Sequence, residues 1–563
     1  TDRTAEEIRQ IRKERNLKPV YKVVDTCAGE FTAETPYSYS TYESTHDITP
    51  LDGPKVMILG GGPNRIGQGI EFDYCCVQAV YGLREAGYKS IMVNCNPETV
   101  STDFDLADRL YFEPITFEDI MNIIEFEKPD GVLVQFGGQT PLKIAEQLTN
   151  EGVKIFGTSS TSIDLAENRE EFARIIKKLK IKIPEYCIAK NYEEIINFSE
   201  IAQFPVLVRP SYVLGGRAMQ IVYNKEQLVD YVFRSAEATN DHPILIDQFI
   251  ENAFEFDVDA LCDGEEVFIA GIMQHIEEAG VHSGDSSCVL PPYDMSNKVK
   301  EDIIDMTTKL ALELNVVGLI NLQFAVKNNE VYVLEVNPRS SRTVPFVSKY
   351  SNVPIANIAA QLSVGKKIRD FNLKENHFKH TAVKKAVLPF KKFKDEKVFL
   401  GPEMKSTGEV MGIDTEPGIA FLKAMQSDGY SVPRTGTAFV SITDIDKKRA
   451  LPIIKDLEKL NFTIIATKGT ADFLLENNIN CTPVFKVGEG RPNVVDEILN
   501  DNIQLVINTP QGAQSRYDEE AIGKTSVMKN VLTITTLAGA KAAIEAMSNM
   551  NKISVAPLQE YFK

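Results

Sequence analysis

Cysteine is scarce in this chain, and no pair of cysteines has the spacing of a zinc site. The eight cysteines are scattered over 563 residues, and Cys75, Cys76 and Cys95 lie inside apolar stretches. Neither a CxxC pair nor a Cys/His cluster at zinc spacing occurs. A chain of this length can bury several cores without disulfides, so we expect a reduced, cytoplasmic enzyme without a cysteine-bound metal.

Long apolar runs and basic patches are also missing. No apolar run approaches the ~18 residues of a membrane span, and no secretion signal opens the sequence. Sixty-one Lys and Arg against 79 Asp and Glu give a net charge of −18, and the densest basic stretch, 384–394, is interrupted by apolar residues. An acidic surface repels phosphate backbones and anionic lipid, so we expect no nucleic-acid partner and no membrane association.

The length favours about three to four domains. Residues 6–15 predict a charged helix, and residues 21–42 have no clear period, so we interpret residues 1–50 as the tail of a preceding domain or as a linker. Short apolar runs then alternate with helical stretches, which predicts an open parallel sheet with ligand loops at the carboxyl ends of its strands. The predicted strands of this sheet are 55–59, 88–94, 131–135 and 153–156.

The glycine-rich loop after the first of these strands lacks the dinucleotide-binding spacing. When the motif is started at Gly60, its third glycine position falls on Arg65, and the second strand ends in Asn94 rather than in a ribose-binding carboxylate. Gly523 is likewise no part of a P-loop, because the glycine required five residues earlier is Asp518. The loop at Gly60 is then either an anion-facing helix start or a tight structural turn.

The stretch from 205 to 259 has features of a nucleotide-binding module. Two predicted strands, 205–209 and 219–223, flank a Gly-containing loop. This loop is either a flap over nucleotide phosphates beside the fixed charge of Arg209, or an ordinary hairpin loop. Farther on, Glu255, Asp257 and Asp259 alternate with apolar residues and therefore share one strand face, where one carboxylate could bind a ribose.

Residues 319–337 predict a β-hairpin that carries a metal site. Two apolar strands flank a turn at 327–330. If the turn centres near Asn329, Gln323 lies across from Glu335, and Asn337 shares their face because side chains alternate. Carboxylate and amide oxygens without His or Cys suit Mg²⁺ shared with nucleotide phosphates.

Two arginines, Arg339 and Arg342, follow this hairpin directly. They would neutralise the charge of a transferred phosphoryl group and hold an anionic acceptor. A hairpin with a purely structural role rarely carries such a polar set on one face with two arginines past its end. These residues therefore predict phosphoryl-transfer chemistry.

Several long strings of this sequence are family-specific. They are GGGPNRIGQGIEFD (60–73), NCNPETVSTD (94–103), QFGGQTP (135–141), RPSYVLGGR (209–217), GVHSGD (280–285), EVNPR (335–339) and STGEVMG (406–412). Over essentially the whole chain the sequence resembles the carbamoyl-phosphate synthetase large chain, in its C-terminal synthetase half. The resemblance implies an α/β fold class in three parts: a pre-ATP-grasp parallel-sheet domain (51–165), ATP-grasp α+β domains (166–430) and a methylglyoxal-synthase-like doubly wound allosteric domain (431–563). Residues 1–50 would be the tail of an oligomerisation or linker domain.

The resemblance also implies ligand contacts for three groups of residues. Arg169 and Arg209 would contact the ATP phosphates, and Glu255 would bind the ribose. Gln248 and Ile250 would border the adenine. The loop near the nucleotide would be formed by Gly280, Val281, His282 and Ser283. Mg²⁺ or Mn²⁺, shared with the nucleotide, would be held by Gln323, Glu335 and Asn337. The phosphoryl acceptor would be faced by Arg339 and Arg342, with Asn337 as the third catalytic residue.

The implied reaction is the MgATP-dependent phosphorylation of carbamate, which gives carbamoyl phosphate for pyrimidine and arginine synthesis. Carbamate oxygen would attack the γ-phosphorus directly, with the protein supplying alignment and positive charge, and closure of the flap would exclude water. In the family, carbamate is made in the N-terminal half of a longer chain that works with a glutaminase subunit. We expect both as partners, with a homo-oligomer as the alternative, and interpret the chain as a fragment or as one part of a split large chain.

The C-terminal part predicts a second doubly wound α/β unit. Its strands, 438–442, 462–466, 504–508 and 531–535, are separated by helical stretches. The turn 467–470 before a helix at 471–477 predicts a phosphate site, although a solvated turn without ligand is the alternative. The resemblance implies an effector site for a nucleotide monophosphate such as UMP or IMP, formed by Ser441, Lys447, Thr467, Thr470, Lys486, Asn508 and Thr535.

Ornithine activation, known in part of the family, is expected to be weak or absent. Glu277 and Asp285 match residues of that site, but Lys385 stands where a glutamate is expected and Thr533 where a tyrosine is expected. A lysine that faces a cationic ligand is unfavourable.

Two other functions fit parts of this pattern. Another ATP-grasp carboxylate ligase, such as a biotin carboxylase-like protein, would share the nucleotide module but not the matched strings or the regulatory domain. A catalytically silent, nucleotide-sensing regulatory subunit would not need Gln323, Glu335, Asn337 and Arg209 together. Carbamate-dependent ADP release that requires Glu335 would separate the enzyme from the sensor.

Overall fold

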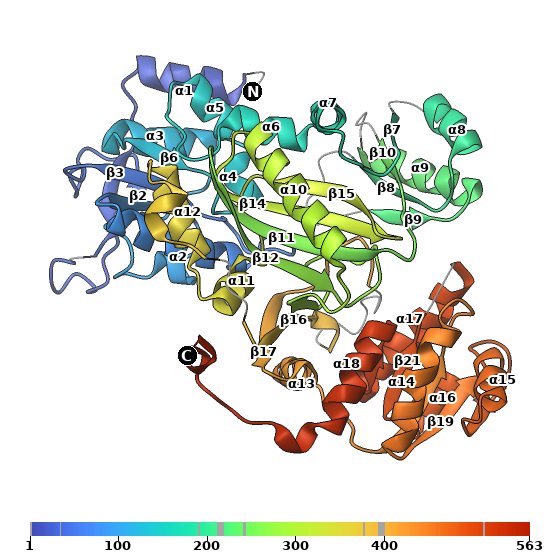
Figure 1. Cartoon of the computed structure of the whole chain (residues 1–563). Coiled ribbons are helices and arrows are strands. Elements are labelled where there is room, and N and C mark those ends of the chain that lie inside the picture. The colour runs from blue at the N-terminus through green and yellow to red at the C-terminus, as the bar shows by residue number, and fades with distance from the viewer. Residues whose placement is uncertain are drawn as a thin grey trace.

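The computed structural model describes residues 3–33, 35–189, 192–210, 219–239, 244–374, 378–391, 400–509 and 513–562. The strands of this part of the chain form four sheets of six, four, seven and five strands, in chain order. In Figure 1 the N-terminal unit (blue) and the C-terminal unit (orange to red) lie at opposite ends of the view, with the central sheet between them. Within the described residues, no helix combines the length and apolar character that a membrane span requires.

The first sheet has the order β1-β2-β5-β4-β3-β6, and its last four strands are parallel. Its strands are β1 (Val20–Val23), β2 (Tyr37–Thr41), β3 (Lys55–Leu59), β4 (Lys89–Val93), β5 (Arg109–Tyr111) and β6 (Gly131–Leu133). The predicted strands at 55–59, 88–94 and 131–135 are confirmed. The strand predicted at 153–156 is wrong, because only Ile155 forms a single bridge, to Val132. The sheet instead gains β5, which the sequence analysis missed.

The first fifty residues pack on this sheet rather than standing apart from it. Strand β2 pairs in parallel with β5, and β1 pairs with β2. Tyr21 is buried against Tyr111 and Phe126. Helix α1 (Ala5–Glu14) is held to α3 (Phe117–Glu127) by ion pairs such as Arg9–Glu125 at 2.8 Å. The interpretation of residues 1–50 as the tail of a preceding domain or as a linker stays a prediction.

Further helices complete the first unit and lead into the next. They are α2 (Ile70–Glu85), α4 (Gln139–Leu142), α5 (Ala145–Asn150), α6 (Ser160–Glu167) and α7 (Arg169–Leu179). Helix α2 packs closely on α12 (Ile355–Ser363): a Cβ added at Gly82 would lie 2.3 Å from the carbonyl oxygen of Asn357. This contact joins the first unit to the central one.

The small sheet β7-β10-β8-β9 belongs to the predicted nucleotide-binding module. Its elements are β7 (Tyr186–Ala189), α8 (Tyr192–Ile201), β8 (Val206–Pro210), β9 (Gln220–Val222), α9 (Lys225–Thr239) and β10 (Ile244–Gln248). The predicted strand pair is confirmed, because β8 and β9 are antiparallel neighbours. The predicted flap at 210–218 lies outside the described residues apart from the backbone of Pro210.

The central sheet is antiparallel, with the order β15-β14-β11-β12-β13-β16-β17. Its strands are β11 (Phe254–Asp263), β12 (Val267–His275), β13 (Cys288–Leu290), β14 (Val317–Lys327), β15 (Glu330–Asn337), β16 (Thr381–Val387) and β17 (Gly408–Asp414). Helices α10 (Asn297–Glu313), α11 (Val344–Ser351) and α13 (Pro417–Ser427) accompany it. The predicted hairpin is β14–β15, and the predicted pairing of Gln323 with Glu335 is confirmed.

A bulge produces that pairing. The two-residue turn, Asn328 and Asn329, has positive φ at both residues, which asparagine tolerates, and it pairs Lys327 with Glu330. From this turn alone, Gln323 would meet Leu334. The register shifts by one residue between Gln323 and Phe324, so Gln323 meets Glu335 instead.

The C-terminal unit is a parallel sheet with the order β20-β19-β18-β21-β22, as a doubly wound unit requires. Its elements are β18 (Gly436–Ser441), α14 (Lys447–Lys459), β19 (Phe462–Thr467), α15 (Lys468–Glu476), β20 (Cys481–Val484), α16 (Val494–Leu499), β21 (Leu505–Asn508), α17 (Ala513–Lys529), β22 (Leu532–Ile534) and α18 (Leu537–Ser548). Helix α15 begins at Lys468, so the predicted turn 467–470 is the first turn of the helix. Strand β20 was not predicted.

Candidate functional site

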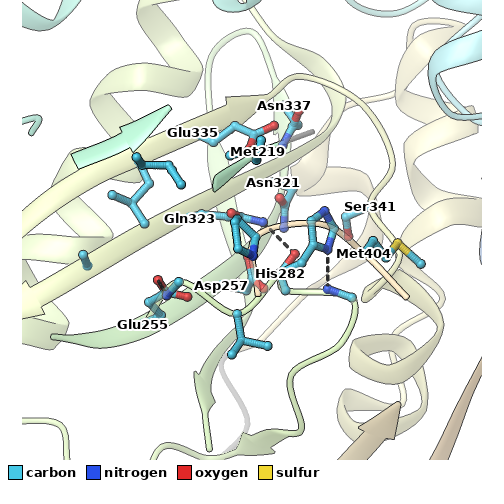
Figure 2. A pocket seen from close by; sticks show the side chains of 18 of the residues that line it. Met219, Glu255, Asp257, His282, Asn321, Gln323, Glu335, Asn337, Ser341 and Met404 are labelled. Atoms are coloured by element: carbon cyan, nitrogen blue, oxygen red, sulfur yellow. Dashed lines mark hydrogen bonds between the residues drawn. The ribbon is translucent and has the colours of Figure 1, made fainter. Parts of the chain in front are cut away.

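One face of the central sheet collects polar side chains from three neighbouring strands. Asp257 of β11 is paired with Gln323 of β14, which is paired with Glu335 of β15, and Asn321 is paired in the same way with Asn337. Paired residues in antiparallel strands point to the same side of the sheet. Figure 2 shows these side chains around one pocket together with His282, which comes from the loop after β12.

The pocket is a cavity of about 280 Å³. It brings together every residue predicted to contact ATP, metal or acceptor: Arg169, Arg209, Gln248, Ile250, Glu255, Gly280, Val281, His282, Ser283, Gln323, Glu335, Asn337, Arg339 and Arg342. Their individual roles stay predictions. All of these residues line one cavity, although Arg169 and Arg342 lie far apart in the sequence.

Two arginines of this cavity share one acidic partner. Arg169 is the first residue of α7, and Arg209 lies on β8. A guanidinium N–H of Arg169 donates to Asp247 Oδ1, and Arg209 Nε lies 3.8 Å from Asp247 Oδ2. One carboxylate cannot balance two guanidinium groups, so this end of the cavity keeps a net positive charge suited to phosphates.

The loop at 280–283 is tied to the polar strand face. The N–H of Gly280 donates to Glu255 Oε1 at 3.0 Å, and Gln323 Nε2 donates to Ser283 Oγ at 2.9 Å. Gly280 has φ of +90°, and a Cβ there would lie 2.7 Å from the ring of Phe249. Glycine is therefore required for this loop to approach the cavity.

The pKa values of the two histidines beside this face are shifted in opposite directions. Burial lowers the pKa of His282, whose Nδ1 accepts from the N–H of Gly284 at 3.0 Å, so the neutral ring carries its proton on Nε2. Burial also opposes a charge on His275, but Cys288, Asp257 and Glu255 raise its pKa well above the usual value. His275 Nε2 lies 2.8 Å from Asp257 Oδ2, and Nδ1 lies 3.2 Å from Glu255 Oε2. An imidazolium at this position orients both carboxylates.

The glycine-rich loop and the start of α2 close the cavity beside the two predicted acceptor arginines. Arg342 Nη2 donates to Glu71 Oε1 at 2.7 Å, and the guanidinium of Arg339 lies 5.9 Å from the ring centre of Phe72. Arg339 Nη2 also donates to Asn337 Oδ1 at 3.1 Å. Residues 67 and 72 line the cavity, so this segment is part of its wall as well as a turn.

The sequence analysis missed several residues of this wall. They are Asp247, Asn321, Ser341, Thr343 and Glu409. Asn321 could have been found from the period of two that selected Gln323, and Glu409 lies inside the matched string 406–412. Nothing in the local pattern distinguishes Asp247, whose role depends on the two distant arginines.

A buried carboxylate supports the floor of the site. Asp259 accepts hydrogen bonds from Asn321 Nδ2 at 3.0 Å, Ser341 Oγ at 2.7 Å and Thr343 Oγ1 at 2.5 Å. Burial raises the pKa of Asp259 to about 6. This group positions three residues that line the cavity without lining it itself.

The donor set at the strand face fits a divalent cation. Gln323 donates its amide N–H to Ser283, so its carbonyl oxygen is left for the cavity, which the Glu335 carboxylate and Asn337 also line. Asp257 Oδ1 is buried without a hydrogen-bond partner among the described residues. Oxygen ligands of this kind are the ones that Mg²⁺ prefers.

A second group of candidate metal ligands lies beside this face. The ligand atoms of Asp257, His275 and Cys288, all buried, lie within 4.8 Å of one another. The three residues are far apart in the sequence, so their spacing gave no signal. The expectation of no cysteine-bound metal stays a prediction.

Most of the predicted effector residues gather at the carboxyl ends of the C-terminal strands. Thr467 Oγ1 lies 3.4 Å from Ser441 Oγ and 3.3 Å from Thr470 Oγ1, and Lys447 Nζ donates to the carbonyl of Gly469 at 2.7 Å. The pKa of Asp444 is lowered mainly by its hydrogen bond to Lys447, with a smaller contribution from the charge of Lys486. Their binding of a nucleotide stays a prediction.

Asn508 ends β21 and is paired with Ser441, so it also lies at the carboxyl ends of these strands. Asn508 and Thr535, the last two predicted effector residues, line another cavity of about 130 Å³ between the central and C-terminal units, together with Glu277, Lys385 and Thr533. Lys385 Nζ lies 3.6 Å from Asp428 Oδ2. Asp285 does not line this cavity.

Three family models match consecutive parts of the chain. They are the carbamoyl phosphate synthase preATP-grasp domain (52–165), the carbamoyl-phosphate synthase L chain ATP binding domain (168–371) and the MGS-like domain (449–535). These matches confirm the predicted fold class and the order of its parts.

Among solved structures, an ADP complex of N5-carboxyaminoimidazole ribonucleotide synthetase has a TM-score of 0.51 at 16% identity, covering 68% of this chain and 97% of that one. A biotin carboxylase from Campylobacter jejuni also has a TM-score of 0.51, at 14% identity, covering 66% of this chain and 91% of its own. These two show a shared fold.

Similar sequences extend over nearly all of the chain. A carbamoyl phosphate synthase large chain from Archaeoglobus fulgidus is 56% identical over 99% of this chain and 52% of its own length. One from Pasteurella multocida is 53% identical over 98% of this chain and 52% of its own length. The chain thus spans about half the length of the curated relatives it matches. With three matching domain models in order and this identity, the chain belongs to the carbamoyl phosphate synthase large chain family of ATP-grasp ligases.

Proposed function

We propose that this chain phosphorylates carbamate with MgATP to form carbamoyl phosphate, the last step of carbamoyl-phosphate synthesis for pyrimidine and arginine biosynthesis. The observation that carries the proposal is the single cavity in which Gln323, Glu335 and Asn337 face Arg339 and Arg342. A metal-binding oxygen set beside cations is the arrangement that phosphoryl transfer to an anionic acceptor requires.

The residues would divide the work by position. Arg169 and Arg209 hold the phosphates at one end of the cavity, and Glu255 with the 280–283 loop contacts the nucleoside. Gln323, Glu335 and Asn337 hold Mg²⁺ or Mn²⁺, which would neutralise phosphate charge. Arg339 and Arg342 hold carbamate so that its oxygen lies in line with the γ-phosphorus.

Neutral His282 would serve as a hydrogen-bond donor rather than as a cation. Its Nδ1 is occupied by the N–H of Gly284, which leaves Nε2–H for a ligand oxygen. Glu71 would hold the Arg342 guanidinium in place through their 2.7 Å ion pair. No covalent nucleophile on the protein is needed.

The C-terminal unit would bind a nucleotide monophosphate such as UMP or IMP and control this reaction. Support comes from the cluster of Ser441, Thr467 and Thr470 hydroxyls at a helix start with Lys447 beside it. The N-terminal synthetase half and a glutaminase subunit would supply carbamate, and a homo-oligomer is the alternative assembly.

The test is ATP formation from carbamoyl phosphate and MgADP by this chain alone, because the reverse reaction needs only the proposed site. Glu335→Gln removes the only carboxylate of the proposed ligand set, and we expect a loss of about 100-fold or more. The matched control is Glu330→Gln, at the other end of the same strand, where an exposed carboxylate meets Lys182 Nζ at 2.8 Å. That variant should keep the wild-type rate.

Two results would contradict the proposal. Equal activity of Glu335→Gln and wild type would show that the proposed metal ligands take no part in the reaction. No ATP at all, with MgADP binding intact by calorimetry and with the partner half present, would support the sensor instead.

A further inference from the structure

Three buried side chains with metal-binding atoms meet beside the polar strand face, on three neighbouring strands. They are Asp257 of β11, His275 of β12 and Cys288 of β13, with exposed fractions of 1%, 4% and 0%. His275 and Cys288 are paired across β12 and β13, so their side chains point to the same side of the sheet. Asp257 is paired with Met273, two residues before His275, and therefore lies on that side as well. The sheet thus brings a carboxylate, an imidazole and a thiol to one place.

The ligand atoms of these three residues lie close enough for a single ion. All three lie within 4.8 Å of one another, and His275 Nε2 is 2.8 Å from Asp257 Oδ2. In a tetrahedral zinc site, bonds of ~2.0 Å to nitrogen or oxygen and ~2.3 Å to sulfur place the ligand atoms about 3.3–3.5 Å apart. Small side-chain rotations would therefore let an ion take the place of the proton between Nε2 and Oδ2.

The surroundings of the cluster supply what a bound ion needs. His275 Nδ1 lies 3.2 Å from Glu255 Oε2, so the ring can donate this N–H to a carboxylate while Nε2 faces the other ligands. Metal-binding histidines commonly make such a contact, because it fixes the ring and its tautomer. Acceptors also exceed donors here, since Asp257 Oδ1 is buried without a hydrogen-bond partner among the described residues. A dication would balance this excess of negative charge.

The cluster lies between two cavities, through which an ion can reach it. Asp257 lines the nucleotide cavity, and His275 lines a neighbouring cavity of about 340 Å³. Lys384 lies across from Cys288 on β16, but its Nζ donates to Glu409 Oε1 at 3.2 Å, so its charge is already balanced. The position beside the thiol is therefore open to a second positive charge.

We propose that Asp257, His275 and Cys288 bind one Zn²⁺, with water as the fourth ligand. A thiolate together with an imidazole and a carboxylate selects Zn²⁺ over Mg²⁺, which prefers oxygen ligands alone. Binding would release the Cys288 thiol proton and the proton between His275 and Asp257. The expectation of no cysteine-bound metal came from spacing along the sequence, which does not detect ligands from three separate strands.

The ion would tie three neighbouring strands of the central sheet together. It would also hold the His275 ring, and through Nδ1 the carboxylate of Glu255, beside the nucleotide cavity. The part that Glu255 takes in nucleotide binding rests on the proposed function, whereas the ion site itself does not.

The test is titration of the metal-free chain with Co²⁺, a spectroscopic substitute for Zn²⁺, in the presence of excess Mg²⁺. We expect one tight equivalent that shows the visible bands of a four-coordinate ion and a thiolate-to-cobalt charge-transfer band, and that Zn²⁺ displaces. Cys288→Ser nearly keeps the size of the side chain but should lose the charge-transfer band and weaken binding by about 100-fold or more. The matched control is Cys262→Ser, a buried cysteine of β11 outside the cluster, which should bind like wild type.

A further variant tests the same site without changing the thiol. Asp257→Asn should keep the charge-transfer band while weakening Co²⁺ binding by about tenfold or more. Zn²⁺ should also raise the midpoint of thermal unfolding of wild type but not of Cys288→Ser, because only the folded chain assembles the site.

Three results would overturn the proposal. They are a wild type without a tight equivalent, a charge-transfer band of equal strength in Cys288→Ser, which would place the ion on other thiols, and a band that Cys262→Ser loses as well. Tight binding that depends on Cys288, in a chain that forms no ATP even with the partner half present, would keep the zinc site and count against the proposed function.

Discussion

The central cavity and the effector cluster of the C-terminal unit hold polar side chains on different kinds of backbone. In the cavity, Asp257, Gln323 and Glu335 project from three paired antiparallel strands. In the effector cluster, Ser441 and Thr467 end parallel strands, and Thr470 lies in the first turn of α15. Side chains on one face of a strand recur at every second residue, so the spacing in the sequence predicts which polar residues share that face. Residues at the ends of strands are harder to predict, because their positions depend on where each strand stops.

The two regions also differ in how charge is arranged. The cavity contains opposed charges that are already paired, such as Arg342 with Glu71 and Arg169 with Asp247. In the effector cluster the hydroxyls of Thr467 and Thr470 bond to each other, and Lys447 is balanced by exposed Asp444 at 2.6 Å. The cavity is therefore held ready for a highly charged ligand, while the cluster offers one cation and several neutral donors.

The largest effect on ligand affinity should come from removing a cation that is predicted to bind phosphate. Arg169→Met is expected to weaken MgADP binding by about 10- to 100-fold, because a charge-assisted hydrogen bond to phosphate is lost. Calorimetry measures this directly. Arg174→Met on the same helix is the control, since the Arg174 side chain is 73% exposed and pairs with Glu171 one turn away. Equal affinity of the two variants would contradict a phosphate role for Arg169.

A smaller effect is expected in the C-terminal unit. Lys447→Met should weaken UMP binding by about tenfold, because a cation beside the hydroxyl cluster is lost from a solvated site. ATP formation without effector should not change. Lys455→Met, an exposed residue of the same helix, is the control. UMP binding that is unchanged in Lys447→Met would break the assignment of an effector site there.

The pH dependence of stability should show whether the pKa of His282 is lowered in the folded protein. Burial lowers the folded-state pKa of His282, so below pH ~6.5 the unfolded chain binds a proton that the folded chain does not. The free energy of unfolding should then fall as the pH falls from ~6.5, by at most about 1.4 kcal/mol per pH unit from this group. Urea unfolding at several pH values should show a shallower slope for His282→Gln. Parallel slopes would mean that the pKa of His282 does not change on folding, which contradicts its lowering by burial.

The smallest response is expected for ornithine. Lys385 places a positive charge at the cavity between the central and C-terminal units, so ornithine should change the rate by less than about twofold. The rate of ATP formation over an ornithine titration measures this. A clear activation would contradict the prediction and would mean that Asp428 neutralises Lys385 effectively.

The sequence predicted the cavity better than it predicted the edges of the fold. All residues assigned to ATP, metal and acceptor line one cavity, because the matched strings and the strand period both point to them. The errors lie where tertiary contacts decide: 153–156 is apolar but forms only one bridge, and β1 and β2 come from a segment without period. Their strands exist because β2 finds a partner in β5, which no local pattern contains.

The hairpin β14–β15 separates what the sequence determined from what only the tertiary structure decided. Its two strands, and the turn at Asn328 and Asn329, follow from local apolar patterning and from the tolerance of asparagine for positive φ. The face on which Glu335 lies does not follow from the turn, because a register set by the turn alone would pair Gln323 with Leu334. The bulge after Gln323 adds the one residue that brings Glu335 onto the face with Gln323 and Asp257. A one-residue shift moves every later side chain to the other face, so the packing of the whole sheet, rather than the hairpin, determined which residues form the predicted metal site.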